Sequence, residues 1–150
     1  MALPMKDSLL LILLILSVGI ACAHADRWDS KGTHLRCRQF AIDAPPNATL
    51  HEVGGETIAA FEISVGQTSF LSIYEIMSEN QQPPTRYSGV PRTTKVSGVE
   101  GVEWRVETRS RTCVTRRAIV SNEVWMLQGC SFQLVDPDAL LATMDSFAVR

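Results

Sequence analysis

Apolar and polar residues alternate along much of the chain, and a period of two is typical of β-strands with one buried face. The clearest case is the segment 101–109. Every second residue from Val102 to Thr108 is Val, Trp or Thr, and every residue between them, from Glu103 to Arg109, is charged. This segment is predicted to be a strand with one face in the protein interior and the other in water.

A hairpin is predicted upstream of that strand. The segments 58–65 and 68–77 are rich in β-branched and aromatic residues, and Gly66-Gln67 between them suits a two-residue type II′ turn with glycine first. In the register of such a turn, one face carries apolar side chains from both strands, namely Phe61, Ile63, Phe70, Tyr74 and Ile76.

Two more strands follow the alternating segment. Residues 112–120 and 123–131 are separated by Ser121-Asn122, a polar pair suited to a tight turn, so segments 101–109, 112–120 and 123–131 are predicted to form a meander. A short first strand is predicted at 38–43. Residues 78–91, rich in Gln, Pro and Ser, are predicted to be a long surface connection.

The chain ends in a predicted helix. Asp136 can cap the free N–H groups, Pro137 suits the first helical position, and an apolar stripe follows at helical spacing: Leu140, Leu141, Met144 and Phe147. Because the strands cluster and the helix comes after them, the predicted fold class is α+β, a mostly antiparallel sheet with a C-terminal helix packed on it.

Residues 1–25 have the layout of a secretory signal peptide. Lys6 precedes about a dozen mostly apolar residues, and Ala23-His24-Ala25 provides a cleavage site, which leaves residues 26–150 as a single domain. The protein is therefore expected to be exported, to the periplasm or the extracellular space. Two alternatives to cleavage stay open, a lipid anchor on Cys22 and an uncleaved membrane helix. For the exported domain itself, a membrane is an expected partner only if Cys22 is lipidated.

Charge is nearly balanced in the expected domain. Removing Lys6 and Asp7 from the totals of 14 basic and 16 acidic residues leaves 13 and 15, a net charge of −2. This balance argues against nucleic acid or an anionic membrane as the dominant partner.

The cysteines indicate a disulfide. A hairpin centred on Ser121-Asn122 pairs residues whose numbers add to 243, which places Cys113 directly opposite Cys130 in a non-hydrogen-bonded pair. The separation of about 4.5 Å between Cα atoms in such a pair is compatible with a disulfide. Alternatives are unbridged buried thiols or a pairing through Cys37, which is otherwise left as the odd thiol, either buried or available to another molecule.

Motifs for catalysis or cofactors are lacking. The sequence has no Cys-x-x-Cys, no Gly-x-Ser-x-Gly and no phosphate-binding glycine loop, and His34 with Cys37 is the single weak metal-ligand spacing. We therefore expect no catalytic residues, no metal and no cofactor, and a protein that is not an enzyme.

An arginine-rich stretch is the best candidate site. Five arginines fall within 13 residues, and the candidate patch for an anion or a partner comprises Arg105, Arg109, Arg116 and Arg117. Adjacent strands would bring Arg105 near Arg116, so the alternative is a solvated face balanced by Glu103 and Glu107.

Three segments resemble the PsbP-like superfamily, which includes the photosystem II extrinsic protein PsbP, Mog-type Ran-binding proteins and many exported bacterial proteins: Phe40–Pro46, Gly98–Trp104 and Ala142–Phe147. The resemblance implies a reduced α/β sandwich that serves in binding or assembly and has no chemistry of its own. Members of the superfamily usually have a helix between the hairpin and the meander, where this chain has prolines and glutamines.

The sequence thus favours an exported, non-enzymatic binding or assembly module of the periplasm or cell envelope, with a protein or a small anionic ligand as partner. The alternatives are a membrane-tethered lipoprotein of the same fold and a small hydrolase or redox enzyme without recognisable motifs.

Overall fold

The computed structural model describes residues 24–29, 32–54, 58–76 and 90–150, with only the backbone described up to residue 32. The expected signal peptide, with Cys22, and the expected connection at 78–91 therefore lie almost wholly outside the described residues.

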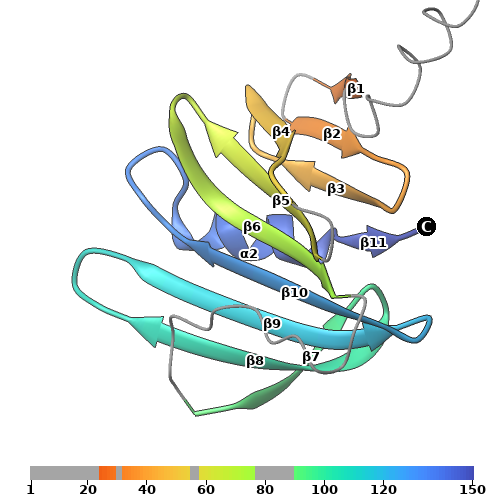
Figure 1. Ribbon diagram of the computed structural model, residues 1–150. Coiled ribbons are helices and arrows are strands. Elements are labelled where there is room, and N and C mark those ends of the chain that lie inside the picture. Colours follow the sequence, from red (N-terminus) through yellow and green to blue (C-terminus); the bar gives the residue numbers. More distant parts are fainter. Residues whose placement is uncertain (1–23, 30–31, 55–57, 77–89) are drawn as a thin grey trace, which may run out of the picture.

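Two antiparallel sheets make up most of the described chain (Figure 1). The larger sheet has seven strands, in the order β4 (Ala48–Glu52), β5 (Ile58–Val65), β6 (Thr68–Ile76), β10 (Glu123–Cys130), β9 (Thr112–Val120), β8 (Val99–Glu107) and β7 (Arg92–Val96). The smaller sheet has four strands, in the order β1 (His24–Asp29), β2 (Gly32–Arg36), β3 (Phe40–Ala44) and β11 (Ala148–Val149).

The predicted α+β class, and with it the reduced PsbP-like α/β sandwich, is wrong. In the described residues the fold is mostly β, and α2 (Pro137–Asp145) is a single helix of nine residues beside two sheets. The prediction missed β4, β7 and three strands of the smaller sheet, namely β1, β2 and β11, because each of them is short.

The main core lies between the two sheets and the helix. Phe40 of β3 contacts Phe61 of β5, Trp125 of β10 and Phe147 just after α2, with ring centroids 5.1, 6.0 and 5.3 Å apart. Helix α2 packs against β3, β10 and β7, with Leu140 and Met144 buried. We call the side of the larger sheet that faces this core its inner face, and the opposite side its outer face.

The C-terminal helix begins as predicted. The Asp136 carboxylate accepts a hydrogen bond from the Ala139 N–H at 2.7 Å, and Pro137 occupies the first turn. Gly129 of β10 leaves room for both β6 and the helix, since a Cβ there would lie 2.6 Å from the Phe70 carbonyl oxygen and 2.8 Å from Leu140 Cδ1.

The predicted register of the first hairpin is wrong beyond its turn. Gly66 has the expected positive φ of 65°, but a bulge follows, so that Ser64 pairs with Ser69 while Ile63 pairs with Leu71. Phe70 is the extra residue and is itself buried. The shift by one residue turns Tyr74 and Ile76 to the outer face, because successive side chains in a strand point to opposite sides.

The predicted wet and dry faces of the alternating segment are also partly reversed. Glu103 is 4% exposed whereas Val102 is 38% exposed. The charged face of β8 is the inner face of the sheet, and Glu103 is buried there because arginines surround its carboxylate, as described below.

Candidate functional site

The predicted disulfide is confirmed. Val120 pairs with Glu123 and the register runs without a break to Cys130 opposite Cys113, whose Cα atoms are 4.1 Å apart in the bridge. Cys37 is free and buried.

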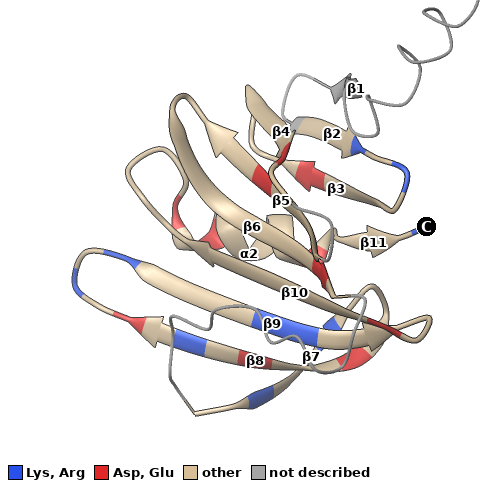
Figure 2. Ribbon diagram, viewed as in Figure 1, with Lys and Arg blue, Asp and Glu red and all other residues tan. Residues whose placement is uncertain are grey.

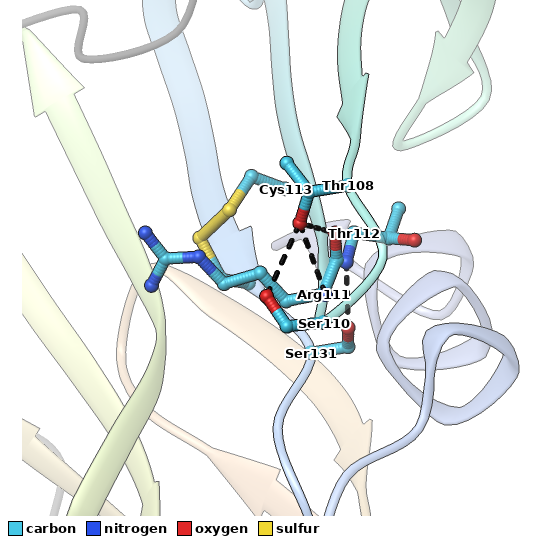
Figure 3. The surroundings of a disulfide bond; sticks show 7 residues. Thr108, Ser110, Arg111, Thr112, Cys113 and Ser131 are labelled. Carbon is cyan, nitrogen blue, oxygen red and sulfur yellow. Dashed lines mark hydrogen bonds between the residues drawn. A yellow bond between two sulfur atoms is a disulfide. The ribbon is translucent and has the colours of Figure 1, made fainter.

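Side-chain hydrogen bonds order the chain around the disulfide (Figure 3). The Thr108 hydroxyl donates to the Arg111 carbonyl at 3.0 Å, the Thr108 N–H donates to the same carbonyl at 2.9 Å, and these bonds close the loop 108–111. The Thr112 N–H donates to the Ser131 hydroxyl at 2.8 Å. The end of the meander is thus held in place by a covalent bond and by local polar contacts.

Glu103 joins two of the predicted arginines. Its Oε2 accepts from Arg116 Nε at 2.7 Å, and its Oε1 accepts from Arg105 Nη2 at 2.8 Å and from Arg105 Nε at 3.2 Å. The side chains of Glu103 and Arg116 are 6% and 5% exposed. Since each guanidinium donates to a different oxygen of one carboxylate, Glu103 bridges Arg105 and Arg116 and reduces the repulsion between their like charges.

Two exposed carboxylates extend this group. Arg116 Nη1 donates to Asp145 Oδ1 at 2.6 Å, and Arg105 Nη1 lies 3.8 Å from Glu107 Oε1. Asp145 is the last residue of α2, where the helix dipole disfavours a carboxylate, so the contact with Arg116 offsets that cost. We call Arg105, Arg116, Glu103, Glu107 and Asp145 the arginine network; it ties the helix to the larger sheet.

The other two predicted arginines lie elsewhere. Arg117 follows Arg116 on β9 and therefore faces the outer side of the sheet, while Arg109 is exposed in the loop 108–111. The structure thus brings Arg105 and Arg116 together through Glu103, and it places neither Arg109 nor Arg117 with them. Whether the four residues serve an anion or a partner stays a prediction.

Exposed cations lie on β7, the last described strand of the larger sheet, and in the loop that joins β8 to β9. Arg92 and Lys95 lie on β7, and Arg109 and Arg111 lie in the loop after β8. None of the four has a salt bridge to any described residue, although Arg92 is opposite Glu103 and Lys95 is opposite Glu100 in the β7–β8 register. We call these four residues the basic edge.

The sequence interpretation missed Arg92 and Lys95 because it contained no strand at β7. The usable signal was Thr93-Thr94 and Val96 directly before Ser97-Gly98, since β-branched residues before a glycine turn are typical of a hairpin.

Charge is unevenly distributed over the fold (Figure 2). Residues 92–117, which form β7, β8 and most of β9, hold seven basic and three acidic residues, a net charge of +4; residues 118–150 hold one basic and four acidic residues, a net charge of −3. A nearly neutral chain therefore has a distinctly basic side, which could attract an anionic partner.

A histidine–aspartate pair lies on the smaller sheet. His34 Nδ1 is 2.5 Å from Asp43 Oδ1, and Arg36 Nε donates to His34 Nε2 at 3.0 Å, so both ring nitrogens are occupied. The nearby Ser146 hydroxyl bonds to the carbonyls of Thr143 and Asp43 and not to the imidazole. The arrangement thus lacks the nucleophile–base contact of a hydrolytic triad.

His34 and Cys37 do not converge either, because Cys37 belongs to the buried core while His34 bonds to Asp43 on the other side of the smaller sheet. Within the described parts of the chain, no group of three or more His, Cys, Asp or Glu side chains is placed to hold a metal ion.

Glu75 is a buried acid on the inner face, opposite Ala59 and Trp125 in register. Its burial, a hydrogen bond with Glu123 and the charge of Glu123 raise its pKa from 4.5 to about 7. This carboxyl group is therefore partly protonated at neutral pH.

Comparison of the chain with protein-family models, with curated proteins and with solved structures finds no match. No helix in the described part of the chain is long and apolar enough to cross a membrane.

Proposed function

We propose that this chain is an exported, non-enzymatic binding or assembly module of the periplasm or cell envelope, and that it binds an anionic partner through its basic edge. Export is supported by the Cys113–Cys130 disulfide, since such bonds persist in oxidising compartments. The observation that carries the binding proposal is that Arg92, Lys95, Arg109 and Arg111 are exposed without salt bridges to the described residues.

The contrast with the arginine network supports the assignment. Arg116 is already paired with Glu103 and Asp145, and Arg105 with Glu103, so a partner would compete with carboxylates that are in place. The cations of the basic edge need no such exchange, and the net charge of +4 over residues 92–117 would steer an anion toward them.

The test is binding of the folded chain to immobilised polyglutamate at physiological ionic strength. The wild type should be retained, and the double variant Arg109→Glu/Arg111→Glu should bind at least about tenfold more weakly, with the difference shrinking at high salt. Arg38→Glu is the matched control, because Arg38 is also an exposed loop arginine but belongs to the smaller sheet. It should bind within about twofold of the wild type.

Three results would contradict the proposal: no retention of the wild type, an equal loss in Arg38→Glu, or tighter binding to double-stranded DNA than to polyglutamate. The last result would identify nucleic acid as the partner.

A further inference from the structure

Strand β7 is the last described strand of the larger sheet, and one of its long sides has no described strand beside it. It pairs with β8 from Arg92 opposite Glu103 to Val96 opposite Val99, and the sheet order places no strand of the described residues beyond it. In Figure 1, β7 forms the free border of the sheet at the end opposite β4. A border of this kind presents unpaired N–H and C=O groups to any extended chain.

The register identifies which groups these are. Ser97 and Gly98 both have positive φ, 51° and 79°, as in a type I′ turn, so Val96 and Val99 form a hydrogen-bonded pair. Bonding then alternates along β7, with Thr94 and Arg92 directed to β8 and with Thr93 and Lys95 directed away from it. No described residue makes a backbone hydrogen bond to Thr93 or Lys95 on that side.

Side chains at this border favour one kind of occupant. Arg92, Thr93 and Lys95 are all exposed, and both cations lack salt bridges to the described residues. A second copy of β7 would bring like charges together across the new pair, which is unfavourable. An acidic strand would instead place carboxylates beside Arg92 and Lys95.

The opposite border of the sheet is less suited to the same occupant. Strand β4 lies against β2 of the smaller sheet, and its exposed end carries His51 and Glu52 in place of two cations. An acidic segment would therefore meet a partly covered and less basic edge there.

We propose that β7 receives an extended acidic segment of a partner protein as an additional strand, hydrogen-bonded to the backbone of Thr93 and Lys95. The inference rests on the proposed function for the sign of the partner's charge, and it adds the partner's class and its mode of binding. The backbone bonds hold the segment, while Arg92 and Lys95 select acidic side chains.

The experiment uses as the probe a short extended peptide of glutamates and valines with glutamates on both of its faces, because Arg92 and Lys95 point to opposite faces of β7. We expect it to bind the wild type and to slow amide hydrogen exchange of Thr93 and Lys95 at least about tenfold, because those N–H groups become bonded. Thr93→Pro should weaken binding at least about tenfold while the fold is kept, because proline removes an N–H that β8 does not use. Thr93→Ala, which keeps the N–H, should bind within about twofold of the wild type.

A modified probe makes the test independent of any protein variant. Methylation of alternate peptide nitrogens along one edge of the probe should abolish binding, and methylation along its other edge should leave binding within about twofold. Equal binding of both methylated probes would overturn strand addition.

The outcomes separate the two proposals. If Thr93→Pro binds the peptide as well as Thr93→Ala does, while Arg109→Glu/Arg111→Glu binds weakly, the anionic partner stands and strand addition is wrong. If all variants bind polyglutamate and the peptide equally, both proposals fail. Protection that appears at Leu50 of β4, whose N–H points away from β5, would mean that the peptide binds the other edge of the sheet. Protection that appears at Thr93 without peptide as the protein concentration rises would mean that a second copy occupies β7.

Discussion

Arginines of one short stretch have two different fates in this fold. Arg116 is buried, and Glu103 and Asp145 bond to it, whereas Arg109 and Arg111 are exposed in a loop without carboxylate partners among the described residues. A buried charge must be paired because its removal from water is costly, whereas an exposed charge stays hydrated and can bind an external partner. The same residue type therefore stabilises the fold in the arginine network and is available for recognition on the basic edge.

The largest expected effect comes from breaking the arginine network. Arg116→Ala should lower the free energy of unfolding by about 3 to 5 kcal/mol, because it leaves the buried Glu103 carboxylate with Arg105 alone and frees Asp145. Arg117→Ala is the control on the neighbouring residue of β9, whose side chain faces the other way, and it should cost about 1 kcal/mol or less. Urea unfolding measures both; equal losses would mean that the pairing of Arg116 does not decide its role.

Removal of the disulfide should have the next largest effect. Cys113→Ser/Cys130→Ser should lower the free energy of unfolding by about 2 to 3 kcal/mol, because it removes the cross-link between residues 17 apart. This loss is smaller than for a cross-link that closes a long loop, because the two cysteines are already close in sequence. Binding to polyglutamate should be unchanged where the variant is folded, since the basic edge keeps its charges. Reducing agent should destabilise the wild type and leave the double variant unaffected; a variant as stable as the wild type would remove the stabilising role of the bond.

Glu75 is the opposite case to Arg116. It is a buried ionisable residue that lies beside a second acid, the carboxyl group of Glu123. Its folded-state pKa of about 7 is above the ordinary 4.5, so its contribution to stability is present below about pH 4.5 and is lost as the pH rises toward 7. Glu75→Gln should therefore stabilise the protein at pH 8, by at most about 3 kcal/mol, and have little effect at pH 4.

Thermal unfolding at several pH values tests this expectation. Glu62→Gln, on the other face of the hairpin that contains Glu75, is the control and should show no such dependence. A pH-independent difference between Glu75→Gln and the wild type would refute the assignment.

The smallest expected effect on stability is that of the basic edge. Arg109→Glu/Arg111→Glu should change the free energy of unfolding by no more than about 0.5 kcal/mol, because neither side chain bonds to a described residue. The same variant should show the largest loss of binding. A large destabilisation would mean that these arginines belong to the fold.

Strands with strong local signals could be predicted from the sequence. Beta-branched residues and a two-residue turn were sufficient for β9 and β10, and the count from Ser121-Asn122 placed Cys113 opposite Cys130. The register of β5 and β6 could not be predicted from their turn, because the bulge at Phe70 depends on how side chains pack in the core on the inner face. The fold class failed for a similar reason, since the smaller sheet is held by tertiary contacts.

Only part of the candidate site could be predicted from the sequence. Proximity of Arg105 to Arg116, with Glu103 between them, follows from strand pairing, but the contact of Arg116 with Asp145, which is 29 residues away, depends on how the helix packs on the sheet. Arg92 and Lys95 were missed because β7 was not predicted. The resemblance to the PsbP-like superfamily stays a prediction about ancestry.

The position of Cys37 has a consequence for how the protein matures. Of the three cysteines in the described residues, two face each other across a local hairpin and the third is 76 residues before the nearer of them and enclosed in the core. A short loop closes far more often than a long one in an unfolded chain, so oxidation selects the native pair before Cys37 can compete. Once the core has formed around it, the remaining thiol is buried, so we expect the reduced chain to form the native bridge on oxidation without an isomerase.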